Sequence, residues 1–297
     1  MRLQRYLLFV LFAICLIGCK GKSTSEGPSP PSDSGYIENK GSDTIVNLAL
    51  AWAEEYQSIH PDVRISVTGG GSGTGIAALF NNTVDIANAS RKIKPEEREA
   101  IEKNGTEPFE FVIARDAIAI IVNPENPIEQ ITLQQLSDIY SGKIDNWKEL
   151  GGEDRPIVRL SREVNSGTHV YFLEEVVRLG DKENKTLFSK DTLLLPSSEG
   201  ITAEVRDNPN AIGYDGLGYV TPDVKVVPVS RGDDSPFIYP SANTVNTDTY
   251  PIARDLYMYT AGQPAGLVKI YLDWIFSPEA QVIVNELGFV PIINSDE

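Results

Sequence analysis

A run of seven residues, Gly-Gly-Gly-Ser-Gly-Thr-Gly at positions 69–75, most strongly constrains how this chain can fold. Before it, apolar and polar residues alternate over 63–67, which predicts a half-buried strand. After it, an unbroken apolar stretch at 76–80 predicts a helix that begins near Ser72. The glycines therefore form a turn into a helix, whose first N–H groups have no intrahelical partner and whose dipole is positive there.

Such a turn is suited to binding a small oxyanion, because glycine lets the backbone approach and Ser72 or Thr74 adds a hydroxyl group. A purely structural turn is the alternative. The flanking strand and helix argue against a flexible linker. The loop is not a P-loop, because Ile76 stands where that motif has lysine, and the dinucleotide-binding pattern fits only loosely.

The start of the chain is typical of an exported lipoprotein. A short basic region, 1–5, precedes about twelve mostly apolar residues, which are too few to span a membrane. The sequence Leu-Ile-Gly-Cys ending at Cys19 resembles a bacterial lipobox, which implies a signal peptide over 1–18 and a lipid on Cys19; an ordinary or uncleaved signal is the alternative. The stretch 20–35 lacks apolar residues, so we predict a lipidated, disordered tether over 19–35.

Composition excludes several classes of function. The only other cysteine, Cys15, is lost with the signal, so neither a disulfide nor cysteine chemistry is expected. The chain has 2 histidines, too few for a His-rich metal site, and we expect no metal or cofactor. The net charge of −16 disfavours nucleic acid as a partner. An anion must therefore be held locally, by backbone donors and buried arginines.

The rest of the chain alternates between predicted strands and helices, which indicates an α/β fold. Helices are predicted at 44–59, from 95, and at 132–141, 265–276 and 278–287, and strands at 84–87, 157–160, 211–214 and 224–229. The strand at 157–160, a polar turn and a helix repeat the arrangement around the glycine loop. The β-prone run 111–122 is predicted to be interrupted at 114–116. This run and 250–259 are predicted to cross between two lobes as a hinge.

Four segments look like parts of one site. They are Gly-Ser-Asp-Thr at 41–44, Gly-Gly-Ser-Gly at 70–73, Ala-Ser-Arg at 89–91 and Ser-Arg-Glu-Val-Asn-Ser-Gly-Thr at 161–168. In order and spacing they closely resemble the periplasmic phosphate-binding proteins of the phosphate ABC importer, the PstS family. The resemblance covers essentially all of 36–297, and the Ser-Arg-(x)3-Ser-Gly-Thr segment is its most specific element.

The resemblance implies a two-lobe, type II periplasmic-binding-protein fold with a ligand crevice and two hinge crossings. The predicted lobes are 36–114 plus 256–297, and 115–255. Such a protein binds inorganic phosphate between its lobes and delivers it to a membrane permease with its ATPase. We accordingly expect a monomeric, non-enzymatic protein that is anchored through Cys19 to a bacterial membrane, in the periplasm or on the outer cell surface.

The predicted phosphate ligands all lie in the four segments: Ser42, Asp43, Thr44, Ser72, Gly73, Ser90, Arg91, Arg162, Ser166, Gly167 and Thr168. By the resemblance, Ser72 and Gly73 donate hydrogen bonds from the first helix start, and Arg162 supplies the charged clamp. Residues 166–168 donate hydroxyl and backbone N–H groups. Arginine suits the planar, charge-assisted grip that phosphate favours.

The sequence departs from the family pattern at one point. At the position of Arg91, well-known members of the family carry an aspartate, which accepts the proton of hydrogen phosphate. At the position of Asp43, those members carry a threonine. We hypothesise that Asp43 accepts the proton and that Arg91 lies close enough to keep Asp43 ionised. Sulfate, which brings no proton, would then be rejected. Alternatively, Arg91 grips phosphate directly or forms a surface ion pair, and Asp43 merely caps the following helix.

The sequence also allows other interpretations of the function. Ser166 and His169 could suggest a hydrolase, but a serine and a histidine three residues apart at a helix start do not point at each other. A carrier of another tetrahedral oxyanion, such as sulfate or a phosphonate, or a phosphate sensor or adhesin, would share the fold. Arg115 and Arg254 are predicted to form ion pairs at the hinge, and Tyr214 is predicted to be a buried strand residue.

Overall fold

The chain divides into two units, Met1–Ser32 and Asp33–Glu297, and the computed structural model describes residues 35–103 and 105–292 of the second. The predicted signal peptide (1–18), Cys19 and the tether up to residue 34 lie outside the described residues. Strand β1 begins at Gly35, one residue before the predicted start of the folded part. In the ranges described, no helix is both long and apolar enough to cross a membrane.

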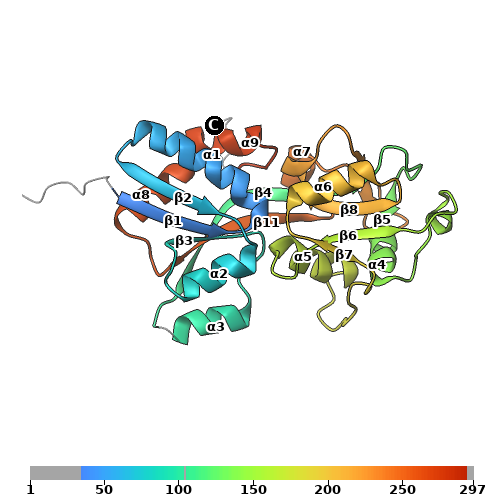
Figure 1. The fold of residues 1–297 in the computed structure, drawn as a ribbon, viewed down its shortest axis with the longest axis horizontal. Helices are drawn as coiled ribbons and strands as arrows, with labels where there is room; N and C mark the ends of the chain where they lie inside the picture. The colour runs from blue at the N-terminus through green and yellow to red at the C-terminus, as the bar shows by residue number, and fades with distance from the viewer. Residues whose placement is uncertain (1–34, 104, 293–297) are drawn as a thin grey trace, which may run out of the picture. The chain divides into compact units, whose positions relative to one another are not determined.

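Strands and helices alternate as predicted (Figure 1). The first half contains β1 (Gly35–Gly41), α1 (Asp43–Ile59), β2 (Val63–Thr68), α2 (Ser72–Phe80), β3 (Ile86–Ala89), α3 (Pro95–Lys103), β4 (Pro108–Val122), β5 (Ile131–Thr132) and α4 (Leu133–Ser141). The second contains β6 (Val158–Arg162), α5 (Gly167–Phe172), β7 (Leu193–Leu195), α6 (Ser198–Asp207), β8 (Ala211–Gly216), β9 (Lys225–Val227), β10 (Val229–Ser230), α7 (Ala242–Asn246), β11 (Ala253–Ala261), α8 (Gly266–Ile275) and α9 (Pro278–Glu286). Short 3₁₀ turns lie at Trp147–Leu150 and Leu217–Tyr219, and a π-helical turn, Leu173–Val177, continues α5.

The long strands β4 and β11 lie in the middle of the principal sheet. Within the described residues its order is β2-β1-β3-β11-β4-β8-β6-β7, with β9 also paired to β4, and β10 and β5 form a separate pair. Strands β2, β1 and β3 run parallel, and β11 pairs antiparallel with β3 and β4. Both β-prone runs are therefore strands of one sheet, and β4 continues unbroken through Arg115, where the sequence predicted an interruption.

The buried apolar residues fall into two groups along this sheet. One group joins β1–β3 and the C-terminal half of β11 with α1, α8 and α9 on one face and with α2 and α3 on the other. Ile86 packs toward α1 and its neighbour Ala87 toward α2, as the alternation of side chains along a strand requires. The other group joins the second half of β4 and β8 with α4, α5 and α6. Each group has its own core.

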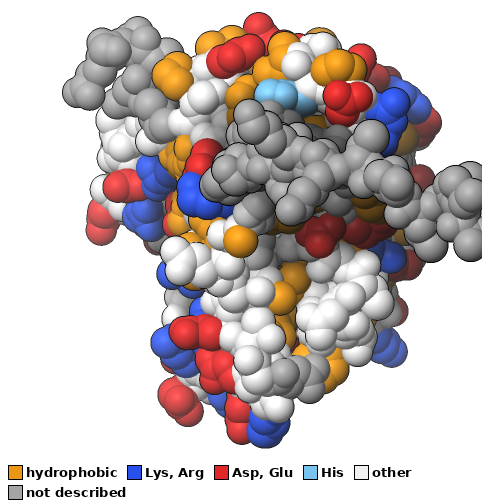
Figure 2. Space-filling view, turned by 90° about the vertical axis from the view of Figure 1, so that its left-hand side faces the viewer, with side chains coloured by type: hydrophobic (Ala, Val, Ile, Leu, Met, Phe, Trp, Pro, Cys, Tyr) orange, Lys and Arg blue, Asp and Glu red, His pale blue; other side chains and the backbone are white. Residues whose placement is uncertain are grey.

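Charged side chains of both signs are dispersed over one face of the molecule (Figure 2). On the face shown in Figure 2, acidic and basic groups are interspersed among scattered apolar side chains. No single-sign basic area is visible among the coloured residues of that face, in keeping with the net charge of −16.

Candidate functional site

The structure brings the four predicted segments together where α1, α2 and α5 begin (Figure 1). Thr44 Oγ1 lies 2.9 Å from Thr168 Oγ1, although the two residues are 124 positions apart. Ser72 Oγ lies 3.3 Å from Ser90 Oγ and accepts the Ser90 N–H at 3.0 Å. A Cβ added at Gly167 would lie 2.3 Å from Ser72 Oγ, so this close approach requires glycine.

Helix starts supply backbone donors at this point. Gly71 precedes α2 with φ of 88°, a conformation that glycine adopts without strain. Ser166 is the N-cap of α5 and accepts the Thr168 N–H at 3.2 Å. The N–H groups of Ser72 and Gly167 make no hydrogen bond to the other described residues. Two unpaired donors at two positive helix ends are suited to binding an anion.

Asn165 ties the two turns together. Its carbonyl oxygen accepts the Gly73 N–H at 3.0 Å, and its Nδ2 donates to the Gly70 carbonyl at 2.8 Å. The donor that was predicted for phosphate at Gly73 is therefore engaged by Asn165 in this structure. Asn165 lies within the predicted segment 161–168 but was not itself predicted as a site residue, because nothing in the sequence pairs it with the glycine loop.

Arg162 is almost fully buried, at 1% exposure. Its Nη1 donates to Ser198 Oγ, and its Nη2 donates to Asp43 Oδ2 and to the Pro196 carbonyl, each at 2.8 Å. Nε reaches the Leu195 carbonyl at 3.3 Å. These contacts fix the guanidinium plane beside the start of α1.

Asp43 is the first residue of α1 and does not cap it. Ser42 holds the N-cap position and makes no side-chain capping bond. Asp43 Oδ1 accepts the Gly70 N–H and Oδ2 accepts Arg162 Nη2, each at 2.8 Å. The capping alternative for Asp43 is therefore wrong, and its carboxylate joins the glycine loop to the clamp.

The predicted proximity of Arg91 to Asp43 is also not found, because Arg91 is paired elsewhere. Arg91 donates both Nη groups to Glu97, at 2.8 and 2.7 Å, and Nη1 also donates to the Lys92 carbonyl. Although burial favours the neutral acid, these bonds hold the pKa of Glu97 below its ordinary value. Arg162, not Arg91, is the cation that contacts Asp43. The structure shows Arg91 in an ion pair, which was one of the predicted alternatives. The Arg91 side chain is only 8% exposed, so it is buried and does not lie on the surface.

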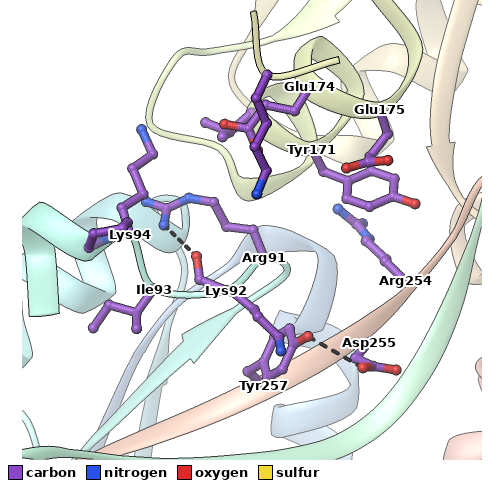
Figure 3. Close-up of a pocket in the computed structure, with 13 residues that line it drawn as sticks. Arg91, Lys92, Ile93, Lys94, Tyr171, Glu174, Glu175, Arg254, Asp255 and Tyr257 are labelled. Carbon is purple, nitrogen blue, oxygen red and sulfur yellow. Dashed lines mark hydrogen bonds between the residues drawn. The ribbon is translucent and has the colours of Figure 1, made fainter. Parts of the chain in front are cut away.

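A cavity of about 540 Å³ lies beside this pair, lined by residues 91–95, by the helical turns that follow Thr168 and by part of β11 (Figure 3). Arg91 turns toward Lys92 and Lys94 on one side of the cavity, and Tyr171 and Arg254 lie next to each other on the other side of the cavity. The Arg254 guanidinium carbon lies 5.6 Å from the centre of the Tyr171 ring, a cation–π contact. The cavity thus borders the site through the residues that follow Ser90 and Thr168.

Asp215 is a buried carboxyl group behind the clamp that was not predicted. Its Oδ1 accepts Ser198 Oγ–H and the Gly216 N–H, each at 2.8 Å, whereas Oδ2 has no hydrogen-bond partner among the described residues. Burial raises its pKa to about 7, and Arg162 opposes that rise. Ser198 Oγ thus links Asp215 to Arg162.

Asp116 and Arg254 form a second buried ion pair, directly opposite each other on β4 and β11. Asp116 Oδ2 accepts Nη2 at 2.9 Å and Nε at 3.2 Å. Arg254 also donates to the Ser90 carbonyl at 3.0 Å and to Thr44 Oγ1 at 3.4 Å. Burial raises the pKa of Asp116, and Arg254 partly offsets this. The predicted ion pairing of Arg254 is confirmed, as is that of Arg115, which pairs with Asp248.

The hydrolase alternative lacks the contact that it needs. His169 Nδ1 lies 3.0 Å from Ser161 Oγ, not from Ser166, and Ser161 Oγ also lies 2.6 Å from Tyr214 OH. Ser161 is fully buried, and burial lowers the pKa of His169. Tyr214 is buried and stacks on Phe172, with ring centres 3.6 Å apart, as predicted for a core residue. Among the described residues, no group of three or more His, Cys, Asp or Glu could hold a metal ion.

Comparison with known proteins places this arrangement in a family. A family model described as a PBP superfamily domain matches residues 27–279. The phosphate-binding protein PstS of Bacillus subtilis is 32% identical, over 96% of this chain and 93% of its own length. The chain belongs to the PstS family of the PBP superfamily. PstS of Pseudomonas aeruginosa is 31% identical, over 98% of this chain and 96% of its own.

Solved structures of this family have the same fold. A protein of Clostridium perfringens, assigned as a phosphate ABC transporter substrate-binding protein and solved with bound phosphate, superposes with a TM-score of 0.77. It is 32% identical and covers 87% of this chain and 100% of its own. An ABC-type phosphate transport receptor of Vibrio cholerae gives a TM-score of 0.69 at 29% identity, over 86% of this chain and 99% of its own. The predicted α/β fold and family are thus confirmed.

Proposed function

We propose that this protein captures inorganic phosphate where α1, α2 and α5 begin and delivers it to a membrane ABC importer. The observation that carries the proposal is the meeting of the starts of α2 and α5, where Gly167 lies against Ser72 Oγ and the N–H groups of both residues are free of partners among the described residues. Arg162, bonded to Asp43 at the start of α1, supplies a buried positive charge. Fixed donors and one guanidinium group in a dry site suit a small tetrahedral oxyanion. Relatives named for phosphate binding, one of them assigned to an ABC transporter, support the choice of anion and partner.

The proposed site comprises the eleven predicted residues, some as ligands and some as supporting groups. Thr44, Ser72, Ser90 and the residues 166–168 line the site with hydroxyl and N–H groups, and Ser42 and Gly73 support the turns. Asp43 accepts the proton of the phosphate while Arg162 holds its carboxylate in place. Arg91 does not contact the anion in this arrangement; its ion pair with Glu97 positions the chain next to Ser90.

The site works by closure of two lobes, 36–114 plus 256–297 and 115–255. Two observations support this division. Apart from Val290 and Tyr219, the buried residues of each large hydrophobic cluster come from one lobe. Among the described residues, β4 and β11 run from one cluster to the other and pair at Asp116 and Arg254. Phosphate that contacts both sides stabilises the closed form by its differential affinity. The protein is a monomer without catalytic activity, exported by the signal peptide 1–18 and held at a bacterial membrane by lipid on Cys19 and the tether 19–35.

Calorimetric titration of the protein with phosphate, arsenate, sulfate and a phosphonate tests the function. Phosphate should bind with the highest affinity, and no phosphate ester should be hydrolysed. The variant Arg162→Met should weaken phosphate binding by about tenfold to a hundredfold, because a hydrogen bond to a charged group contributes about 1.5–3 kcal/mol. Arg155 is partly exposed and, among the described residues, forms an ion pair with Glu153 alone, so Arg155→Met provides the matched control.

Preference for sulfate or a phosphonate would assign the site to another oxyanion, and binding of none of the four would overturn the proposal. Phosphate binding that is unaltered in Arg162→Met would place the anion elsewhere. Asp43→Asn tests the proton acceptor, because undiminished phosphate preference over sulfate in that variant contradicts the role of Asp43. Membrane fractionation of Cys19→Ser tests the anchor, which should release the variant from the membrane.

A further inference from the structure

Asp215 is a fully buried carboxyl group with one unused oxygen, placed behind the clamp of the site. A single hydroxyl group separates it from Arg162, because Arg162 Nη1 donates to Ser198 Oγ and Ser198 Oγ donates to Asp215 Oδ1, each at 2.8 Å. The Gly216 N–H is the second donor to Oδ1. Asp215 Oδ2 is buried without a partner among the described residues, which is unusual for a carboxylate.

The charged groups around Asp215 do not balance. Arg162 on β6 and Arg254 on β11 are the cations, and Asp43, Asp116 and Asp215 are the carboxylates that these arginines face. The remaining titratable neighbours are Tyr214 and Tyr219, which burial keeps neutral by raising their pKa values, and exposed Glu199, which turns toward Asn47. With every carboxyl group ionised, the cluster carries a negative charge before any anion arrives.

Phosphate would add further negative charge to this cluster in a site that excludes water. Uncompensated charge in a buried site is costly, and a carboxyl group usually responds by taking up a proton. At Asp43 and Asp116 both oxygens already accept hydrogen bonds from protein donors, so a proton bound there would displace one of these bonds. The role proposed for Asp43 needs only a hydrogen bond from a proton that stays on the phosphate. Asp215 Oδ2 is free to carry a proton without breaking any contact that the structure shows.

We propose that Asp215 takes up a proton when phosphate binds, so that anion binding at this site is linked to protonation of a residue that does not touch the anion. This proposal rests on the proposed phosphate site. Protonation removes the competing negative charge behind Arg162, while Ser198 still donates to Oδ1 and keeps the guanidinium group in position. The pKa of about 7 that burial gives Asp215 allows this proton to move near neutral pH.

The test is calorimetric titration with phosphate between pH 6 and 8.5, in buffers of different ionisation enthalpy, which yields the number of protons bound per phosphate. Asp215→Asn keeps the shape and the hydrogen bond from Ser198 but cannot ionise. The wild type should take up more protons than this variant, by up to about one above neutral pH, and its affinity should fall relative to the variant by up to about tenfold per pH unit. Phosphate titrates in the same range in both proteins, so the difference isolates Asp215.

The matched control is Asp233→Asn, which removes an exposed carboxylate without an ion-pair partner among the described residues and should behave as the wild type. A second measurement uses wild-type protein alone: the infrared difference spectrum on adding phosphate should show the C=O band of a newly protonated carboxyl group. Equal proton uptake in wild type and Asp215→Asn would overturn the proposal, as would absence of that band. Loss of the uptake in Asp43→Asn alone would assign the proton to Asp43. Failure of the wild type to bind phosphate would instead refute the proposed function.

Discussion

The buried pair between Asp116 and Arg254 provides a sharp test of how the centre of the sheet is held together. The two residues face each other across β4 and β11, with exposures of 0% and 5%. Arg254→Met keeps most of the side-chain volume but removes the cation. Asp116 then retains only backbone donors, including Leu217 N–H at 3.2 Å, for a carboxylate without a counter-charge.

The expected loss of stability at pH 8 is about 4 kcal/mol, because removing one partner of a buried ion pair costs about 3–5 kcal/mol. The Ser90 carbonyl and Thr44 Oγ1 also lose their donor. The double variant Asp116→Asn/Arg254→Met leaves no unpaired charge at this position of β4 and β11, so it should be less destabilised than Arg254→Met alone. A single domain has a stability of about 5–15 kcal/mol, so the single variant should still fold.

The effect should depend on pH in a defined direction. Burial already raises the pKa of Asp116, and loss of Arg254 removes the interaction that opposes this rise. A carboxyl group whose folded pKa is raised binds its proton more tightly when folded, so stability falls as pH rises from the unfolded to the folded pKa. The destabilisation by Arg254→Met should therefore be largest at pH 8 and smaller at pH 5.

Urea unfolding followed by the fluorescence of the buried Trp52 and Trp147 measures these differences. A destabilisation at pH 8 of under about 1 kcal/mol would refute the reasoning, because this is no more than an exposed ion pair contributes. Equal destabilisation at pH 5 and pH 8 would show that lost packing, rather than the unpaired carboxylate, accounts for the effect.

Three further predictions concern the site. Asn165→Ala removes the bond to the Gly70 carbonyl and should weaken phosphate binding by about fivefold, which calorimetry measures, because such a bond contributes about 1 kcal/mol. Gly167→Ala places a Cβ 2.3 Å from Ser72 Oγ and should abolish tight binding while circular dichroism shows a folded protein; normal affinity would contradict the close approach. Asp215→Asn should raise the unfolding temperature at pH 8 but not at pH 4, because the raised pKa of this carboxyl group lowers wild-type stability only as pH rises toward about 7.

Local patterns in the sequence were sufficient to predict much of the fold. The bounds of β2 and α2 agree with the prediction, because the alternating strand, the glycine turn and the apolar helix are each encoded by adjacent residues. The uninterrupted course of β4 through Arg115 and Asp116 could not be predicted in this way. Polar residues inside a strand look like a break until the partners that neutralise them, on β11 and beyond, are known.

The sequence was sufficient to predict which segments meet, but not which charged side chains pair within them. All four segments meet, because each carries a recognisable turn at a strand end or a helix start. Which charges pair depends on tertiary geometry, so the hypothesis joined Asp43 to Arg91, whereas the structure joins it to Arg162. The sequence did contain a partial signal for the pairing of Arg91 with Glu97. Glu97 lies in the first turn of α3, where acidic residues are favoured, and its side chain accepts the Lys94 N–H at 2.8 Å. This position keeps Glu97 close to residue 91.

The two carboxyl groups beside Arg162 therefore have separable consequences. Asp43 lies at the start of α1 and contacts the glycine loop and Arg162. In the proposed site we therefore expect its charge to meet the anion and to discriminate between an oxyanion that carries a proton and one that does not. Asp215 reaches the site only through Ser198, so its charge alters how strongly Arg162 attracts any anion. Neutralising Asp43 should change the ratio of phosphate to sulfate affinity, whereas neutralising Asp215 should change how both affinities vary with pH and leave their ratio nearly constant. If one substitution altered both properties, Asp43 and Asp215 would titrate as a coupled pair, and neither carboxyl group would have a separate role.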